Sequence, residues 1–261
     1  MSTNINDFSM DFFSLKGKKA IVTGGCSGLG QAFSLALAKA GADIFCFAFV
    51  NDDGTTQKLI EDCGVQYYFM QGDVTEDGMC EKVAAKCVEV FGQIDILVNC
   101  AGICNIADVL DFGRKEWDPM IAINLTGAFD LSHEVAKYMI PQRSGKIINI
   151  CSLFSFLGGL GSPAYAAMKA GLMGLTKAYA DELGKYNICV NGIAPGYFQT
   201  AMTQGTGSAD NEKYIRIKDH IPADRWGDRQ DLMGAMVFLA SHASDYVNGT
   251  LLVVDGGYLV R

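Results

Sequence analysis

Short apolar runs alternate with longer segments of helical periodicity along most of the chain. The apolar runs are rich in β-branched and aromatic residues, and they cover residues 19–22, 42–49, 65–70, 94–98 and 146–150. Helical segments such as Gln31–Lys39 lie between them, and Leu251–Arg261 fits a last strand with an apolar tail. This alternation predicts an α/β fold in which a doubly wound parallel sheet carries helices on both faces.

The length of 261 residues, 49% of them hydrophobic, suits one α/β domain built on a buried sheet. We expect this domain to span residues 15–261, after an N-terminal arm at residues 1–14 that packs on a neighbour. Residues 200–210 contain two glycines among small polar residues and precede a predicted short helix at 211–220. Such a segment suits a substrate lid near residues 200–220, and an ordinary surface insertion is the alternative.

A glycine-rich turn joins the first predicted strand to the first helix, with the sequence Thr23-Gly24-x-x-x-Gly28-x-Gly30. Glycines let the backbone turn tightly and approach a pyrophosphate, while the helix N-terminus supplies N–H donors and positive dipole character. The turn therefore predicts a dinucleotide site, with a purely structural βα turn as the alternative.

Ser152, Tyr165 and Lys169 are the strongest candidates for chemistry. Ser152 follows an apolar strand, and Tyr165 and Lys169 are spaced so that one helix face carries both. A free tyrosine titrates near 10, so a base at neutral pH needs a shift of about 3 units, or roughly 4 kcal/mol, which a neighbouring ammonium can supply. A surface Tyr-Lys pair on an ordinary helix is the alternative.

Several other candidates also follow predicted strands, namely Asp73, Val74, Asn99, Ala101 and Gly102. Ligands of doubly wound sheets bind beyond the carboxyl ends of the strands, so we expect these residues and the glycine turn to share one edge. After the second strand, Ala48 takes the place where an acid often binds ribose, and the nearest acids are Asp52 and Asp53. Without a nearby cation, this pattern favours NAD over NADP.

The formal net charge is −8 without a basic stripe, which argues against nucleic acid or an anionic membrane as partner. Nine cysteines are scattered without a C-x-x-C pair or a histidine at zinc spacing, so we expect reduced thiols and no metal site. The N-terminus lacks a signal-sequence pattern, and no apolar span is long enough to cross a bilayer. These features favour a cytoplasmic protein.

Together the motifs resemble the short-chain dehydrogenase/reductase family from about Leu15 to Arg261. The matching elements are the glycine turn, Asn99-Cys-Ala-Gly102 with one substitution at Cys100, the set Asn124, Ser152, Tyr165 and Lys169, and Pro195–Thr200. The resemblance implies a Rossmann fold and hydride transfer between NAD or NADP and a secondary alcohol or ketone.

The resemblance also implies a role for each matching residue. Tyr165 is the implied acid/base, Ser152 binds the reacting oxygen, Lys169 lowers the pKa of Tyr165, and Asn124 anchors a water through its helix backbone. Implied cofactor contacts are Gly24, Ser27, Gly28, Leu29, Gly30, Asp73, Val74, Asn99, Ala101, Gly102, Tyr165, Lys169, Pro195, Gly196, Phe198 and Thr200. A turn role for Asp73, a structural role for Asn99 and local bonding of Asn124 stay open.

Three segments of the C-terminal part resemble the 2-dehydro-3-deoxy-D-gluconate 5-dehydrogenase and gluconate dehydrogenase group: Ile221–Gly227, Asp231–Gly234 and Ala243–Gly249. The opening Phe8–Gly17 resembles uncharacterised bacterial oxidoreductases beside that group. This resemblance implies a sugar acid or polyol as the substrate and a homotetramer with the tail at an interface.

One departure from the gluconate-type pattern concerns the substrate. Those members often carry arginines directly after the Ala-Gly step, where this chain has Ile103–Ala107. Cations that could replace them near the predicted lid are Arg216, Lys218, Arg225 and Arg229, with a solvated helix face as the alternative for each. Two other functions also stay open: a nucleotide-binding regulator without catalysis, and an epimerase or dehydratase of the extended branch.

Overall fold

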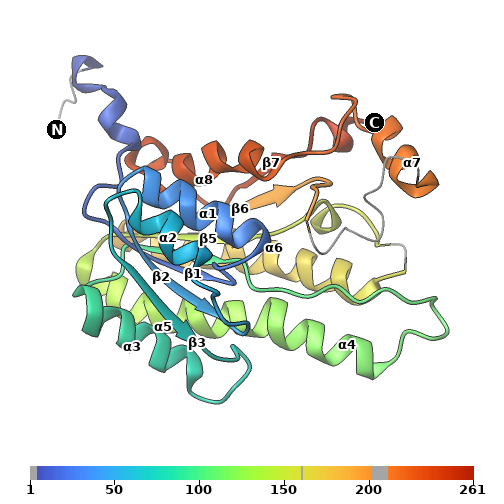
Figure 1. The fold of residues 1–261 in the computed structure, drawn as a ribbon, viewed down its shortest axis with the longest axis horizontal. Coiled ribbons are helices and arrows are strands. Elements are labelled where there is room, and N and C mark those ends of the chain that lie inside the picture. Colours follow the sequence, from blue (N-terminus) through green and yellow to red (C-terminus); the bar gives the residue numbers. More distant parts are fainter. Residues whose placement is uncertain (1–4, 160, 201–210) are drawn as a thin grey trace.

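A seven-stranded sheet forms the centre of the molecule (Figure 1). The computed structural model describes residues 5–159, 161–200 and 211–261. The strands are β1 (Lys19–Thr23), β2 (Asp43–Ala48), β3 (Tyr67–Gln71), β4 (Ile96–Asn99), β5 (Gly145–Ile150), β6 (Ile188–Pro195) and β7 (Leu251–Val254). All neighbours pair in parallel in the order β3-β2-β1-β4-β5-β6-β7. The order reverses between β1 and β4, where sheets of this kind bind ligands.

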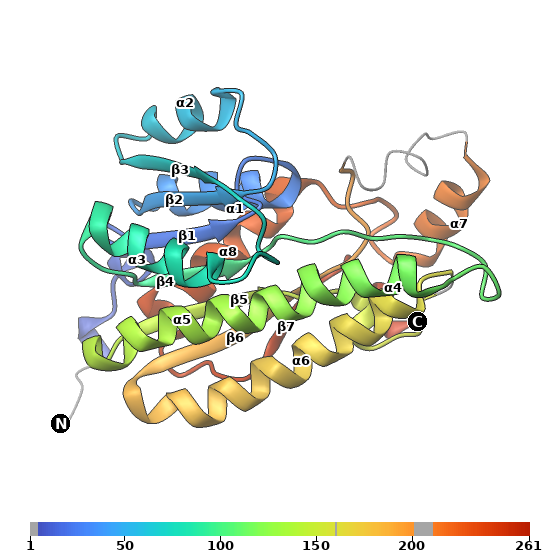
Figure 2. The ribbon, with the colours of Figure 1, turned by 90° about the horizontal axis from the view of Figure 1, so that it is seen from below.

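Helices cover both faces of the sheet. They are α1 (Gly28–Lys39), α2 (Thr55–Glu61), α3 (Met79–Phe91), α4 (Arg114–Ile121), α5 (Gly127–Gln142), α6 (Pro163–Leu183), α7 (Glu212–His220) and α8 (Met233–Ala240). One face carries α1 and α8, and the other carries α3, α5 and α6 (Figures 1 and 2). A π-helical turn at Ala122–Thr126 joins α4 to α5.

The two layers of core follow from the alternation of side chains along each strand. In β4, Ile96 and Val98 pack with α1 and α8, whereas Leu97 packs with α3 and α5. The predicted doubly wound sheet with helices on both faces is thus confirmed. Several boundaries differ by one or two residues, and both β3 and β4 begin two residues later than their apolar runs. The Gln66 backbone N–H, just before β3, donates to the Asp43 carboxylate at 2.7 Å.

The described part of the arm forms two 3₁₀ turns, at Ile5–Asp7 and Met10–Phe13. The Phe8 and Phe12 rings stack with centroids 5.4 Å apart, while the Ile5 side chain is exposed. Packing of this arm on a neighbour, and the division into an arm and one domain, stay predictions. None of the described helices is both long and apolar enough to cross a bilayer.

Candidate functional site

The glycine turn is held tightly between β1 and the segment after β4. Gly24 has a left-handed φ of +65°, and a Cβ there would lie 3.3 Å from the Ala101 Cα. A Cβ at Gly30 would lie 2.2 Å from the Gly24 carbonyl oxygen, so a side chain is excluded at Gly30. Thr23 fixes the same junction, because its Oγ1 accepts from the backbone N–H groups of Cys100 and Ala101, each at 2.9 Å. Thr23 was not among the residues predicted to form the site.

The N-terminus of α1 suits an anionic ligand. Helix α1 begins at Gly28, whose φ is +53°, and a Cβ there would meet no described atom within 4 Å. Ser27 precedes the helix without a side-chain cap, so it leaves the first N–H groups of α1 to another acceptor. Backbone donors and dipole at an open helix end fit a pyrophosphate group.

The acids after β2 are engaged with the start of α2. The Asp52 carboxylate accepts from the backbone N–H groups of Thr56 at 3.3 Å and Gln57 at 3.1 Å, and from the Tyr67 hydroxyl at 2.7 Å. Asp53 accepts from the Thr55 N–H at 2.9 Å. These contacts give both carboxylates a structural role, while their negative charges remain at the end of β2.

Two predicted cofactor residues point their side chains at protein partners. The Asp73 carboxylate closes its own turn by accepting from the Thr75 N–H at 2.9 Å and hydroxyl at 2.8 Å. The Asn99 amide lies in the core, where it donates to Ser132 Oγ and Asn149 Oδ1, each at 2.9 Å. The turn role of Asp73 and the structural role of Asn99, which the sequence left open, are therefore both present.

Val74, beside Asp73, is buried against Gly127. A Cβ at Gly127 would lie 2.8 Å from a Val74 methyl group, so the start of α5 approaches this turn closely. Gly102 also lies close to a helix residue, since its Cβ would lie 3.3 Å from Asn124 Oδ1. The strand ends and the helix starts of this edge therefore leave little room for larger side chains.

Asn124 binds the chain after β4 rather than its own helix. Its Oδ1 accepts from the Ile103 N–H at 2.9 Å, and its Nδ2 donates to the Ile103 carbonyl at 2.8 Å. The side chain is buried within the π-helical turn. Turns of this kind are rare and occur frequently at functional sites. The alternative, in which Asn124 hydrogen-bonds within its own helix, is therefore not observed.

Helix α6 brings Tyr165 and Lys169 to the end of β5, where Ser152 lies. Pro163 occupies the first turn of α6, a position that tolerates proline because the missing N–H has no helical partner there. The Lys169 ammonium is buried, donates to the Ile150 carbonyl and lies 5.6 Å from the centre of the Tyr165 ring. Ser152 is also buried, and its Oγ accepts from the Phe154 N–H at 3.3 Å. The structure thus brings the three predicted residues together.

Burial has the largest effect on the pKa values of Tyr165 and Lys169. It raises the pKa of the Tyr165 phenol above its usual value, and a hydrogen bond with Ser152 acts in the opposite direction. Burial also lowers the pKa of the Lys169 ammonium. Both groups are therefore pushed toward their neutral forms. Acidification of Tyr165 by Lys169 stays a prediction.

The segment after β6 begins where it closely approaches the end of β7. The Gly196 N–H donates to the Val254 carbonyl at 2.9 Å, and a Cβ at Gly196 would lie 2.7 Å from the Asp255 Cα. Phe198 is buried against Gly227, so its ring belongs to the core. Thr200 ends this described segment, and residues 201–210 of the predicted lid at 200–220 lie outside the described residues.

Other predicted features can be placed within the described residues. The cysteines described are free thiols, and no group of three or more His, Cys, Asp or Glu side chains there is arranged to hold a metal ion. The predicted site residues follow strands β1, β3, β4, β5 and β6, and thus lie at one edge of the sheet.

Comparisons with known proteins agree with this geometry. A family model described as enoyl-(acyl carrier protein) reductase matches residues 24–259. An uncharacterised oxidoreductase of Escherichia coli strain K12, YgcW, is 67% identical over 99% of this chain and 98% of its own. The 2-dehydro-3-deoxy-D-gluconate 5-dehydrogenase of the same strain is 46% identical over 95% of this chain and 98% of its own.

A solved structure shares the fold as well. The gluconate 5-dehydrogenase of Burkholderia cenocepacia J2315, in complex with NADP and tartrate, has a TM-score of 0.91 at 37% identity and covers 96% of this chain and 98% of its own. The relatives and the family model all cover far more than half of the chain. The chain therefore belongs to the short-chain dehydrogenase/reductase family of NAD(P)-dependent oxidoreductases.

Proposed function

We propose that the protein transfers hydride between NAD and a secondary alcohol or ketone of a sugar acid. The observation that carries the proposal is the meeting of the Tyr165 phenol, the Ser152 hydroxyl and the Lys169 ammonium beyond the end of β5. The names of the relatives, a deoxygluconate and a gluconate dehydrogenase, support a sugar acid over a plain polyol. They also favour an oxidoreductase over a silent regulator, an epimerase or a dehydratase.

The proposed mechanism assigns proton transfer to the side chains of this chain. The nicotinamide ring, when bound, supplies the hydride acceptor or donor. Tyr165 takes the hydroxyl proton in oxidation and returns it in reduction. Ser152 holds the reacting oxygen, and the charge of Lys169 favours the phenolate. Because both ends of the Asn124 amide bind Ile103, we assign the predicted water to the backbone of the π-helical turn.

The residues proposed to hold the cofactor lie around the open end of α1. Gly24, Ser27, Gly28, Leu29 and Gly30 would contact the phosphates and the adenosine ribose. The backbone at Asp73–Val74 would meet the adenine, while Asn99, Ala101 and Gly102 would line the ribose side, with Asn99 doing so through its backbone. The segment Pro195–Thr200 would cover the nicotinamide, with Phe198 again contributing backbone.

NAD is proposed over NADP because no lysine or arginine lies in residues 23–30 or 48–53, where the carboxylates of Asp52 and Asp53 remain. A 2′-phosphate near this place would meet negative charge rather than a cation. The Burkholderia relative was solved with NADP, so the preference needs a direct comparison of both cofactors.

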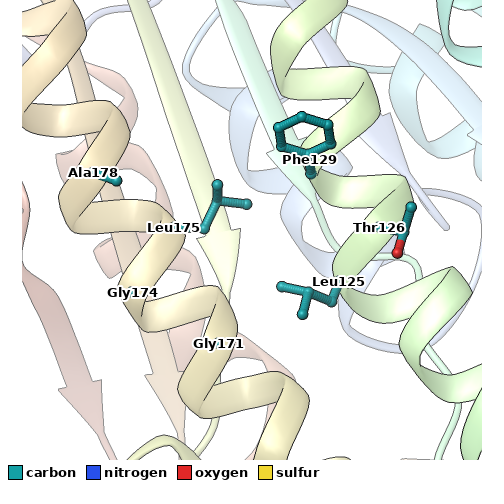
Figure 3. Close-up of a pocket in the computed structure, with 7 residues that line it drawn as sticks. All are labelled: Leu125, Thr126, Phe129, Gly171, Gly174, Leu175 and Ala178. Atoms are coloured by element: carbon teal, nitrogen blue, oxygen red, sulfur yellow. The ribbon is translucent and has the colours of Figure 1, made fainter.

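We also propose a homotetramer. A groove of about 400 Å³ lies between the outer faces of α5 and α6 (Figure 3). It is mostly apolar, with Leu125, Phe129 and Leu175 beside the small residues Gly171 and Gly174. Phe129 is 45% exposed, and Val260 in the C-terminal tail is exposed as well. Small residues let helices approach closely, so a second copy could cover this face. A light-scattering mass of one chain would contradict the tetramer.

A substrate panel with both cofactors tests the proposed function. We expect cofactor absorbance to change with hexonates such as D-gluconate and 2-dehydro-3-deoxy-D-gluconate, and with NAD favoured over NADP by about tenfold in kcat/KM because of the acids after β2. Turnover only with uncharged alcohols would contradict the sugar acid, and a clear NADP preference would contradict the cofactor assignment.

Replacement of the proposed acid/base gives a second prediction. Tyr165→Phe should lower kcat by about 10²-fold or more, because proton transfer by a positioned side chain contributes roughly that factor. Cofactor binding, measured by calorimetry, should persist. The matched control is Tyr246→Phe, since Tyr246 is fully exposed. Near-normal turnover by Tyr165→Phe would show that another group is the base.

Removal of the buried ammonium should change the pH dependence. A positive charge beside an acid lowers its pKa, so Lys169→Met should raise the pKa of Tyr165 and move the rising limb of the oxidation rate to higher pH. Lys177→Met, on the exposed side of the same helix, is the control and should leave the profile in place. A reduced rate with an unshifted profile would show that Lys169 acts only through binding.

A further inference from the structure

Two thiols meet at the glycine turn. Cys26 lies within this turn, and Cys46 lies in β2 with its side chain buried. The two thiols hydrogen-bond each other. The turn itself packs on the second thiol, because a Cβ at Gly25 would lie 3.1 Å from the Cys46 Sγ. Both thiols are free in the structure, so this contact brings together two reduced sulfurs from separate elements.

Further hydrogen bonds hold Cys26 in this position. Its carbonyl accepts from the Thr56 hydroxyl at 3.2 Å, and the Thr56 oxygen accepts from the Gln31 amide at 2.9 Å. These contacts tie the turn to both α1 and α2. The Cys26 thiol donates to the Val50 carbonyl, at 3.7 Å between sulfur and oxygen, and the residue is only half-buried. The sulfur is therefore held in one orientation and is accessible to small molecules.

The surroundings of Cys26 favour its thiolate. The hydrogen bond from Cys46 lowers the pKa of the Cys26 thiol, although burial and the charges of Asp52 and Asp53 oppose this effect. Helix α1 begins two residues later, and the dipole at its N-terminus also favours a negative charge. Burial acts differently on other thiols, since it raises the pKa of Cys80, Cys87, Cys100, Cys104 and Cys151. Because the thiolate is the nucleophile in thiol oxidation, Cys26 is the sulfur that reacts first.

We propose that Cys26 and Cys46 form an oxidation site, at which a hydroperoxide converts the two thiols to a disulfide. The Cys26 thiolate attacks one peroxide oxygen and becomes a sulfenic acid as the O–O bond breaks. The oxygen anion that leaves takes up the proton that Cys26 gave to solvent. The Cys46 sulfur then attacks the Cys26 sulfur, and its proton leaves with the departing hydroxide as water. Two electrons pass from the two thiols to the peroxide.

A disulfide at this place would displace the glycine turn. Its two sulfurs are about 2.0 Å apart, much closer than two hydrogen-bonded thiols, so one of the two elements has to move. Strand β2 is held on both sides, by β1 and β3, which leaves the turn as the part that moves. The turn has little room, since a Cβ at Gly25 would lie 2.9 Å from the Ser34 Oγ. The open end of α1 would therefore lose its present geometry.

The proposed contacts of Gly24, Ser27 and Gly28 with the coenzyme belong to this same turn. Oxidation would therefore weaken coenzyme binding and, with it, turnover, and a thiol reductant would restore both. This effect on the coenzyme rests on the proposed function, whereas formation of the disulfide does not. The two parts of the inference are consequently measured separately.

The test treats the purified protein with hydrogen peroxide and maps its cysteines by peptide mass spectrometry without reduction. We expect two peptides joined through Cys26 and Cys46, which dithiothreitol separates. In calorimetry, the Kd for NAD should rise about tenfold on oxidation, because roughly one hydrogen bond to the charged pyrophosphate is lost. The Kd should return to its first value after reduction.

Two variants accompany that measurement. Cys46→Ala removes the second sulfur and the hydrogen bond that favours the Cys26 thiolate, so peroxide should give no joined peptides and no change in Kd. Cys63→Ala is the matched control, because it removes another half-buried thiol, which donates to the Leu59 carbonyl. This variant should respond to peroxide as wild type does.

Three results would decide against parts of this account. Oxidised wild type without joined peptides, while the reduced protein binds NAD, would overturn the inference and leave the proposed function intact. Joined peptides with an unchanged Kd, or an equal rise of Kd in Cys46→Ala, would overturn the effect of the disulfide on the coenzyme. A reduced protein that binds neither NAD nor NADP would contradict the proposed function instead.

Discussion

The arrangement of the site depends on how α6 is fastened to the end of β5. Two contacts make this junction: the Lys169 ammonium donates to the Ile150 carbonyl, and the Ser155 hydroxyl donates to the Lys169 carbonyl at 2.8 Å. Ser152 lies between Ile150, which ends β5, and Ser155 in the chain, so the same junction that buries Lys169 brings Ser152 to Tyr165. A charged amine is costly to bury without a partner, and the Ile150 carbonyl supplies one.

This junction also sets the protonation states of the two groups in the structure. Burial favours the neutral phenol of Tyr165 and the neutral amine of Lys169. A base needs the opposite state, and an added positive charge within about 4–6 Å lowers the pKa of an acid by about 1–3 units. An oxidised nicotinamide ring would supply such a charge if it bound beside Tyr165, in addition to the proposed effect of Lys169.

The sequence predicted the parts of the site that depend on local pattern. The glycine turn, the strand ends and the spacing of Tyr165 and Lys169 are each readable within a few residues, and the order of strands and helices then places them at one edge. Contacts between residues that are far apart in the sequence could not be predicted from it. The bond of Asn124 to Ile103 depends on a π-helical turn, and the engagement of Asp52 with α2 depends on how the chain turns after β2.

The placement of α7 shows the same limit. The sequence predicted a short helix here, and only the stacking of Tyr214 on Trp226 shows which part of the sheet that helix approaches. The side chain of Asn99 is a converse example, because a residue of the family motif lies in a buried network rather than toward a ligand. The motifs identified these residues in the sequence. The contacts of each side chain depend on residues that are distant in the chain and adjacent only in the fold.

The central proposal is that burial favours the protonated form of Tyr165 and that nearby positive charge, from Lys169 and from a bound oxidised cofactor, would make it a base. Carbon-13 NMR of tyrosine labelled at Cζ, assigned with Tyr165→Phe, measures the pKa of this phenol directly. The account predicts a pKa above the usual value of about 10 in the protein alone, and a fall of about 1–3 units when NAD⁺ is added. A Tyr165 pKa that does not move on saturation with NAD⁺ would contradict it.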